Sequence, residues 1–118
     1  MSGSGYGEMQ PAIDECEACH DTCVRAVADC LEKGGGHAEA RHIGALLDCI
    51  GMCAAATSFM LRTSPMHGRL CGLCAEVCDA CAASCERFVN DDVMHGCAAE
   101  CRLCAASCRA MAHLAAHW

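Results

Sequence analysis

The chain has 118 residues, of which 15 are cysteine, and a formal net charge of -7. Nucleic acid is bound by clustered Lys and Arg, so no nucleic-acid partner is expected for so acidic a chain. No apolar run approaches the roughly 18 residues of a membrane span, and the first residues lack the basic and apolar regions of a signal peptide. We therefore expect a cytoplasmic protein without a membrane partner, in a compartment that keeps thiols reduced.

The length is that of a single domain, but the core-forming residues are unusual. Cys and Ala stand where a domain of this size normally carries Leu, Ile, Val and Phe. The opening stretch, MSGSGYGEMQ, predicts a flexible tail over residues 1–10. Residues 11–118 are then predicted to form one helical domain.

The first two helices are predicted on either side of a glycine run. The first covers residues 11–33, with Pro11 in its first turn, where proline is favoured. The glycines at 34–36 are a strong stop signal. The second helix is predicted over residues 38–62.

The third helix is predicted to follow a break in the pattern at Thr63-Ser64-Pro65. Either Ser64 or Thr63 is a suitable N-cap, because both side chains can accept a hydrogen bond from the first turn. Pro65 would then occupy the first helical position. This helix is predicted over residues 65–88.

The fourth helix is predicted over residues 92–116, with Asp91 or Asp92 as its cap. All four segments are about 20 to 25 residues long and are joined by short loops, which is typical of bundles. The predicted fold is therefore all-α: an antiparallel up-down four-helix bundle with a cysteine-lined interior.

The cysteines follow the helical period in every predicted helix. In LCGLCAEVCDACAASC, residues 70–85, five cysteines occur at steps of 3, 4, 3 and 4, and CAAECRLCAASC nearly repeats this spacing. Such steps place side chains on one helix face, and charges such as Glu76 and Arg102 fall on the other. From Cys71 to Cys85 the row is about 21 Å long at 1.5 Å per residue. The predicted inward-facing thiols are Cys16, Cys19, Cys23, Cys30, Cys49, Cys53, Cys71, Cys74, Cys78, Cys81, Cys85, Cys97, Cys101, Cys104 and Cys108.

Metal binding is the function that these rows favour. A buried cysteine can act as a small apolar filler, but Leu or Ala would fill the core without the oxidation risk. Disulfides are disfavoured, because cysteines at i and i+4 of one helix are poorly placed for an S–S bond. A catalytic thiol would be single and displayed in a cleft, so no enzymatic activity is expected.

Cu(I) is the metal that the spacing favours, with many ions per chain. Side chains at i and i+4 have Cβ atoms about 5–6 Å apart, so two sulfurs can converge on one ion and a facing helix can supply a third. Low-coordinate thiolate sites suit Cu(I), whereas Zn prefers four ligands in a tetrahedron. One Cu(I) per thiolate is also neutral, while Zn with four thiolates brings negative charge into a dry interior. The alternatives are sequestration of zinc or another soft metal, and a thiol-redox protein.

The stretch SPMHGRLCGLCAEVCDACAASC, followed by CAAECRLCAASCRAM, resembles the cytosolic four-helix-bundle copper storage proteins. The resemblance covers nearly the whole chain after the tail, and it is specific, because several CxxxC pairs on four helices are rare elsewhere. It implies many Cu(I) ions at thiolate-bridged sites, roughly one per cysteine, and a homotetramer of bundles. His42 departs from the pattern, since relatives carry another cysteine seven residues before the equivalent of Cys49.

The two ends of the predicted bundle differ in residue type. His42, Met94 and His95 gather near the connections of helices one to two and three to four, and are predicted as further copper ligands. The resemblance also suggests imidazoles near the start of helix four, so this end is the predicted entrance. The other end carries residues that are predicted to be weak Cu(I) ligands or an apolar plug: Met9, Met60, His67 and Met111.

Two further properties follow from the residue types. Leu73, Leu103 and several alanines lie on helix faces away from the thiols, which predicts packing against other copies of the chain. Thiols can stay protonated near their ordinary pKa of about 8.5, so the bundle is expected to fold without metal. Loading would then release about one proton per thiol.

Overall fold

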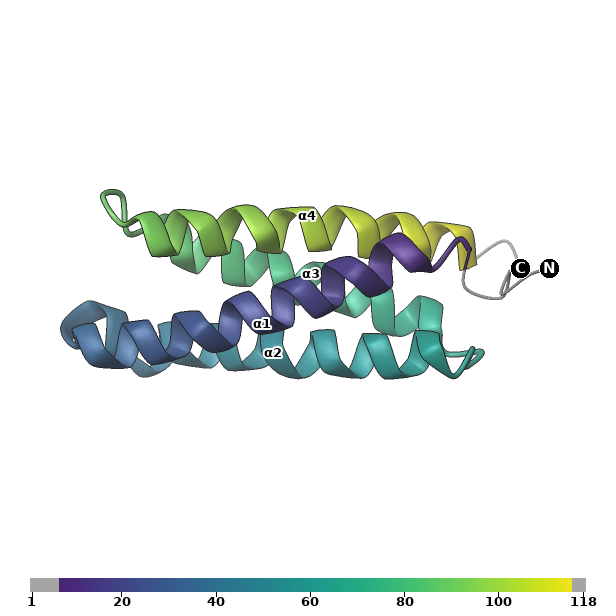
Figure 1. The fold of residues 1–118 in the computed structure, drawn as a ribbon, viewed down its shortest axis with the longest axis horizontal. Helices are drawn as coiled ribbons and strands as arrows, with labels where there is room; N and C mark the ends of the chain where they lie inside the picture. The colour runs from purple at the N-terminus through teal and green to yellow at the C-terminus, as the bar shows by residue number, and fades with distance from the viewer. Residues whose placement is uncertain (1–6, 116–118) are drawn as a thin grey trace.

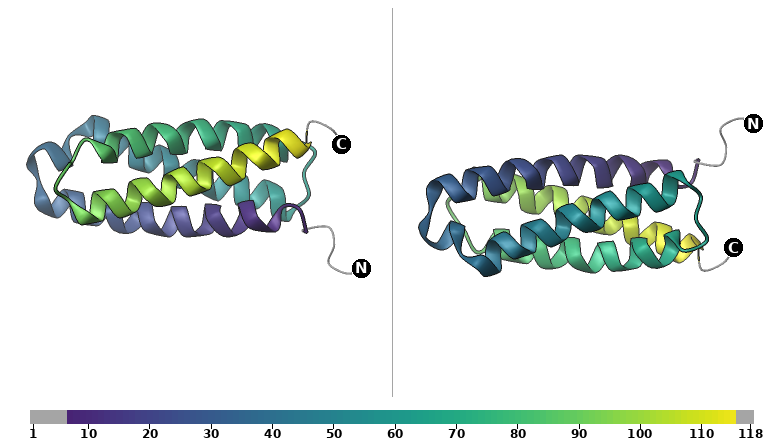
Figure 2. Two further views of the ribbon diagram at one scale, coloured as in Figure 1. Left: turned by 90° about the horizontal axis from the view of Figure 1, so that it is seen from above. Right: turned by 90° about the horizontal axis from the view of Figure 1, so that it is seen from below.

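Four long helices run antiparallel along one axis in the computed structural model, which describes residues 7–115 (Figure 1). Each helix packs against the helices before and after it, and the last returns beside the first (Figures 1 and 2). The predicted all-α, up-down four-helix bundle is therefore confirmed. The elements are α1 (Gln10–Lys33), η2 (Gly35–Ala38), α2 (Ala40–Leu61), α3 (His67–Glu86) and α4 (Asp92–Ala115).

The connection between α1 and α2 is built on glycine. Gly34 and Gly35 have φ values of 70° and 55°, which residues with a side chain rarely adopt. The N–H of Gly34 donates a hydrogen bond to the Cys30 carbonyl at 3.0 Å and so closes the end of α1. The second helix was predicted to begin at residue 38, and this start is wrong. A short 3₁₀ turn, η2, occupies that position, and the extended backbone of Glu39 separates it from α2.

The connection between α2 and α3 also differs from the prediction. Pro65 lies in a turn and not at the first position of α3, which begins at His67. The reason is the backbone of Thr63, whose φ of 52° reverses the chain and leaves the next residues outside the helix. The predicted cap, Ser64 or Thr63, is also wrong, because Met66 occupies the N-cap position; the Oγ atom of Ser64 accepts the N–H of Met66 at 3.1 Å in the turn before the helix. The helix also ends at Glu86, two residues earlier than predicted.

Asp91 joins three elements at one end of the bundle. Its carboxylate accepts the N–H of Met94 at 3.1 Å, which confirms it as the cap of α4. It also binds Lys33 of α1 at 2.9 Å and His37 of η2 at 2.7 Å. Hydrogen bonds from Lys33 and from the Met94 N–H hold the pKa of Asp91 well below its usual range. This end of the tube is therefore tied together at a single carboxylate.

Sulfur and small side chains fill the interior. All fifteen cysteines are buried, and alanine is the commonest of the other buried residues. Branched aliphatic residues are fully buried only at Ile13 and Leu46 among the described residues. Met9, which falls within the predicted tail, is 2% exposed, while residues 1–6 of that tail and residue 116 of the last predicted helix lie outside the described residues.

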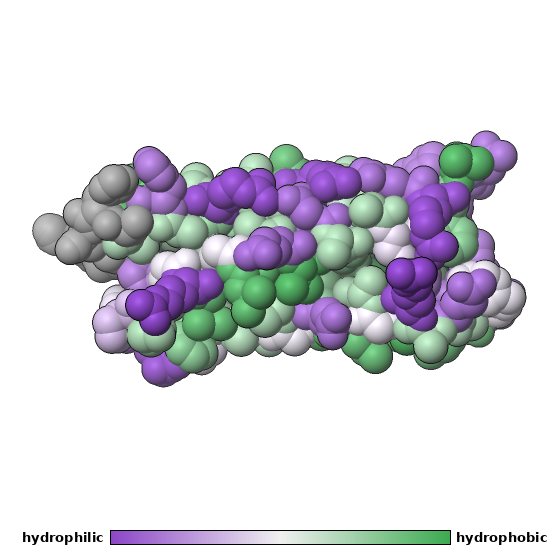
Figure 3. Space-filling view, turned by 180° about the vertical axis from the view of Figure 1, so that it is seen from behind, coloured by the Kyte–Doolittle hydropathy of each residue, from purple (hydrophilic) through white to green (hydrophobic). Residues whose placement is uncertain are grey.

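The prediction that no apolar segment is long enough to span a membrane does not hold for α2. By length and composition alone, α2 is apolar enough to cross a membrane, because it is rich in Ala, Leu and Gly and carries few charges. Within the bundle, 28% of its apolar window is buried, and Cys49 and Cys53 face the interior. Apolar side chains also gather in the middle of the face opposite to that of Figure 1 (Figure 3).

The contact of α3 with α4 makes a prediction about two glycines. A Cβ at Gly68 would lie 2.6 Å from the Cβ of Ala115, whereas one at Gly72 would lie 3.7 Å from the Cβ of Ala112. Gly68→Ala should therefore lower the free energy of unfolding by about 1–3 kcal/mol through overpacking. Gly72→Ala, the matched control, should be neutral or stabilise by up to about 1 kcal/mol through helix propensity.

Thermal unfolding of the reduced, metal-free variants, followed by circular dichroism, measures both changes. Equal stability of Gly68→Ala and the unchanged protein would show that the two helices do not approach as closely as described.

Candidate metal centre

The fifteen thiols line the inside of the bundle. Each cysteine is at most 1% exposed, and all of them are free thiols. The prediction that every cysteine faces inward is confirmed. Cysteines spaced three and four residues apart lie on one face of a helix. In all four helices this face is turned toward the bundle axis, so the sulfurs meet there.

Neighbouring sulfurs touch across helix interfaces. The Sγ atoms of Cys16 and Cys108 lie 3.4 Å apart, and those of Cys19 and Cys49 lie 3.6 Å apart. These distances correspond to van der Waals contact or to weak S–H···S hydrogen bonds. Contacts of this kind link most of the thiols, whereas Cys30 contacts His42 and Met94.

Pairs at i and i+4 have the predicted geometry for sharing an ion. The Sγ atoms are 3.8 Å apart in Cys74–Cys78 and 3.9 Å apart in Cys104–Cys108. If an ion lay about 2.3 Å from both sulfurs, the S–metal–S angle at the ion would be about 110°. A linear pair would need sulfurs about 4.6 Å apart on the same bond length. The bent arrangement leaves room for a third ligand from a facing helix.

Four groups of four thiols are close enough to hold metal, with all sulfurs of a group within 4.8 Å of one another. Successive groups overlap: the first two share Cys53 and Cys104, and the last two share Cys23 and Cys101. Cys19 connects the second group to the third. The groups are Cys16, Cys53, Cys74 and Cys104; Cys19, Cys53, Cys78 and Cys104; Cys19, Cys23, Cys49 and Cys101; and Cys23, Cys81, Cys97 and Cys101.

The protonation of the thiols depends on burial and on their neighbours. Burial raises the pKa of Cys30 to about 11. The hydrogen bond with Cys108, together with burial, raises the pKa of Cys71 at the other end of the row. In contrast, hydrogen bonds from Cys104 and Cys108 lower the pKa of Cys16 to about 6. Cys30 and Cys71 are thus neutral at pH 7, and thiolate character arises where neighbouring thiols donate to a sulfur, as at Cys16.

The predicted entrance contains a sulfur–imidazole–thioether cluster. The Nε2 atom of His42 lies 3.4 Å from the Sγ atom of Cys30, and the Met94 sulfur lies 3.7 Å from the same atom. All three side chains are fully buried. The structure therefore brings His42 and Met94 to the end of the thiol row, against Cys30.

His42 is oriented by a hydroxyl group on α3. Its Nδ1 atom is 2.7 Å from the Oγ atom of Ser84, so a proton on Nδ1 leaves the Nε2 lone pair facing Cys30. Burial lowers the pKa of His42, and the positive charge of Arg87 lowers it further. A neutral imidazole is the form that binds a metal ion.

The structure separates His95 from this cluster. His95 follows the buried Met94 by one residue and is exposed on the outer side of α4. The imidazole that lies near His42 is instead that of His37. The ring centroids of His37 and Phe88 are 4.1 Å apart. The ring centroids of Phe88 and His42 are 4.8 Å apart, so Phe88 lies against both imidazoles. Sequence periodicity did not reveal this arrangement, because His37 and Phe88 lie outside the long helices.

The opposite end is closed by methionines. Met60 and Met111 are at most 1% exposed, and His67 is 4% exposed with its Nδ1 atom 2.7 Å from the Ser64 carbonyl. Together with Met9, they fill the bundle beyond the last thiols. His20 lies at the edge of the row, where it lines a groove of about 510 Å³ with Cys53 and hydrogen-bonds to Asp21.

Glu100 is an ionisable group in the wall of the tube that the sequence did not single out. One of its carboxylate oxygens is buried on α4, facing α1. Burial, together with the neighbouring Glu15, raises the pKa of Glu100 to about 8. This carboxyl group is therefore largely protonated at pH 7, as expected for a dry interior that does not tolerate unpaired charge.

The sequence matches a known family over most of its length. A family model described as "Copper storage protein" covers residues 6–113. The chain is also 33% identical, over 103 residues, to the uncharacterized cysteine-rich protein YhjQ of Bacillus subtilis (strain 168). That match covers 87% of this chain and 94% of the relative.

Solved structures show the same fold. The Nmul_A1745 protein from Nitrosospira multiformis has a TM-score of 0.86 and 43% identity, covering 92% of this chain and 97% of the other. The Cu(I)-bound copper storage protein BsCsp3 has a TM-score of 0.84 and 32% identity, covering 89% and 98%. Apo-Csp3 from Bacillus subtilis has a TM-score of 0.79 and 32% identity, covering 87% and 97%.

The lowered pKa of His42 predicts a pH dependence of stability. In the unfolded chain a histidine takes up a proton near pH 6.5, whereas the folded protein resists protonation at this site. The unfolded state therefore binds more protons below that pH, and stability falls as the pH drops, by at most about 1.4 kcal/mol per pH unit. His42→Gln should remove this part of the slope.

The measurement is the melting temperature of the reduced, metal-free protein between about pH 7 and about pH 5. His95→Gln, a change at an exposed imidazole, is the control and should keep the slope. An unchanged slope in His42→Gln would contradict the protonation assigned to the buried cluster.

Proposed function

The chain belongs to the copper storage protein family, and on this premise we propose that it stores Cu(I) along the thiol row inside its bundle. One observation carries the proposal: fifteen free thiols are buried in the bundle, and eleven of them form overlapping four-sulfur groups. A relative of the same fold, at 32% identity, is described as Cu(I)-bound. Storage requires many equivalent ligands shielded from solvent and not one activated residue, so the proposed role is sequestration and not catalysis.

Shared thiols favour Cu(I) over zinc. Cys53 and Cys104 each belong to two four-sulfur groups, so separate tetrahedral sites would compete for them. Thiolates that bridge successive Cu(I) ions use shared sulfurs without conflict, because each ion needs only two or three ligands. The charge balance points the same way, since Cu(I) with one thiolate adds no net charge to the buried interior.

The proposed ligands are the fifteen cysteines, with His42 and Met94 completing the row at the Asp91 end. His42 supports this role because its lone pair can face Cys30 while Ser84 holds its other nitrogen. His95 was also predicted as a ligand. Its exposed position supports at most a role on the outer surface of the same end.

Location and assembly are part of the same proposal. A store built on free thiols works where thiols stay reduced, so the protein is placed in the cytoplasm without a membrane or nucleic-acid partner. Leu73 and Leu103 are 48% and 56% exposed, which supports packing of bundles into a homo-oligomer, with the tetramer implied by the family resemblance. Size-exclusion chromatography with light scattering tests this assembly, and a strictly monomeric mass would contradict it.

Copper capacity is the direct test of the store. An anaerobic Cu(I) titration of the reduced protein against a chromophoric competing chelator should reach its end point at about ten or more ions per chain, because most thiols contribute to an ion. About three or four ions would indicate a zinc-like cluster. One ion or none would mean that the thiols serve redox chemistry or packing.

Single cysteine variants refine this titration. Cys53→Ser removes a sulfur that belongs to two groups, whereas Cys85→Ser removes one that belongs to none of the four. Cys53→Ser should therefore lower the copper-to-chain ratio more than Cys85→Ser. Equal losses would show that the overlapping groups do not organise the bound copper.

The metal-free protein should already be folded. Its thiols are buried as small, mostly neutral side chains, so the helices need no metal to pack. Far-ultraviolet circular dichroism should show a helical apo protein whose signal changes by less than about a tenth on loading, while about one proton is released per thiol that binds copper. An unfolded apo chain would contradict this prediction.

A further inference from the structure

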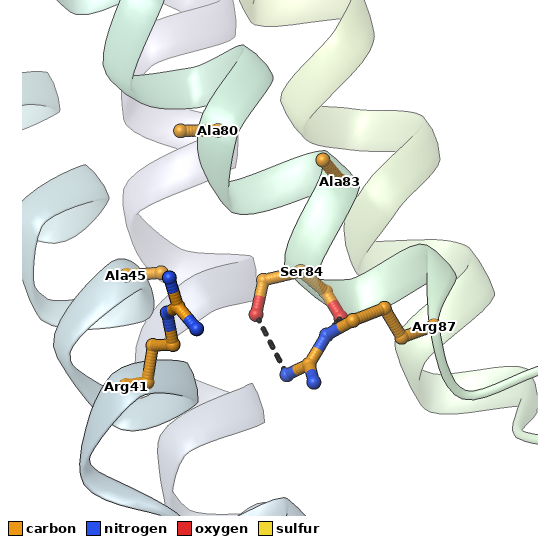
Figure 4. Close-up of a pocket in the computed structure, with 6 residues that line it drawn as sticks. All are labelled: Arg41, Ala45, Ala80, Ala83, Ser84 and Arg87. Carbon is orange, nitrogen blue, oxygen red and sulfur yellow. Dashed lines mark hydrogen bonds between the residues drawn. The ribbon is translucent and has the colours of Figure 1, made fainter.

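An open groove lies between α2 and α3, directly outside the buried His42. It has a volume of about 350 Å³ and is lined by Arg41, Ala45, Ala80, Ala83, Ser84 and Arg87. Figure 4 shows the guanidinium groups of Arg41 and Arg87 pointing into the space between the two helices from opposite sides. The alanines leave this space open, and none of the lining residues is acidic.

The two arginines lack a carboxylate partner in a protein of net charge -7. Within residues 7–115, the side chain of Arg41 makes no hydrogen bond or ion pair, while the side chain of Arg87 donates only to the carbonyl and hydroxyl oxygens of Ser84 at 3.3 Å. In contrast, Arg102 and Arg109 pair with Asp79 on the other side of α3. Two guanidinium groups around one small groove match the planar, bidentate geometry of a carboxylate or phosphate.

The groove is one side chain away from the proposed copper ligands. The Oγ atom of Ser84 accepts a hydrogen bond from Arg87 and lies 2.7 Å from the Nδ1 atom of His42. The other nitrogen of that imidazole faces the Sγ atom of Cys30 at 3.4 Å. An anion held between the arginines would therefore sit next to the residue that begins the row.

We propose that this groove binds the carboxylate of a small thiol that carries Cu(I), and so docks the carrier beside His42. The proposal rests on the proposed storage function. Cu(I) is a soft ion that thiols hold in a reducing compartment, so the copper that arrives is already bound to a thiolate. In the transfer, the copper–sulfur bond to the carrier breaks and one to a protein thiol forms. The proton of that thiol passes to the carrier sulfur, and no electron is transferred.

The first test needs no copper. N-acetylcysteine, which has a carboxylate, and its methyl ester, which has none, are titrated into the reduced, metal-free protein and followed by amide NMR signals. The acid should give saturable shifts at Ala45, Ala83 and Ser84, whereas the ester should not. Arg41→Gln with Arg87→Gln should abolish these shifts. Equal shifts with acid and ester would overturn the carboxylate site, whatever the copper capacity of the protein.

The second test measures transfer from preformed Cu(I) complexes of the same two thiols, followed by copper–thiolate absorbance. The ratio of the two initial rates, acid over ester, is the readout, because it cancels changes that affect both donors. This ratio should fall by about fivefold or more in the Arg41→Gln and Arg87→Gln double variant. The control, Arg25→Gln with Arg62→Gln, changes the net charge equally and should keep the ratio of the unchanged protein.

The outcomes separate this proposal from the storage function. Inorganic phosphate should slow transfer from the acid complex and not from the ester complex, since it competes for the same arginines. Docking would be overturned, even if copper still loads fully, by either of two results. The acid-to-ester rate ratio could be unchanged in the Arg41→Gln and Arg87→Gln double variant, or it could fall equally in the Arg25→Gln and Arg62→Gln control. A protein that binds no copper but shows the acid-specific NMR shifts would refute the store and retain the anion site.

Discussion

The structure depends on one property of the cysteine side chain: a neutral thiol packs as a small apolar group, yet becomes a metal ligand when it loses its proton. Fifteen such groups fill the axis of the bundle and are at most 1% exposed. The atoms that hold the fold together are therefore the atoms proposed to hold copper. This arrangement allows the ligand row to form before metal arrives, because thiols such as Cys30 and Cys71 are buried as neutral groups.

The ends of the tube follow from a different set of interactions. At one end, Asp91 caps α4 and binds Lys33 and His37, which leaves the imidazole of His42 and the thioether of Met94 against Cys30. At the other end, methionines fill the interior beyond the last thiols. The polar end has ionisable groups, a groove with two arginines and an oriented imidazole, and it stays the predicted entrance for copper.

Much of the fold was predictable, because the steps of the cysteine rows fix both the helices and their inward faces. The same reasoning placed His42 and Met94 correctly at the end of the row. It failed where the chain leaves the helical period: the positive φ of Thr63 moves Pro65 into a turn, and η2 brings His37 to Phe88. His95 follows Met94 by one residue, which is enough to rotate it to the surface. The contact of Ser84 with His42 joins α3 to α2 and follows no short sequence pattern.

The position of the bound metal tests the row of thiols most directly. Crystals of the protein loaded with Cu(I) under anaerobic conditions would be measured on both sides of the copper absorption edge, so that anomalous differences locate the copper alone. The thiol row predicts a line of copper peaks along the bundle axis, each between sulfurs of the overlapping groups, and continuing to Cys30 and His42. Copper confined to surface sites such as His20 and Asp21, with an empty interior, would contradict it.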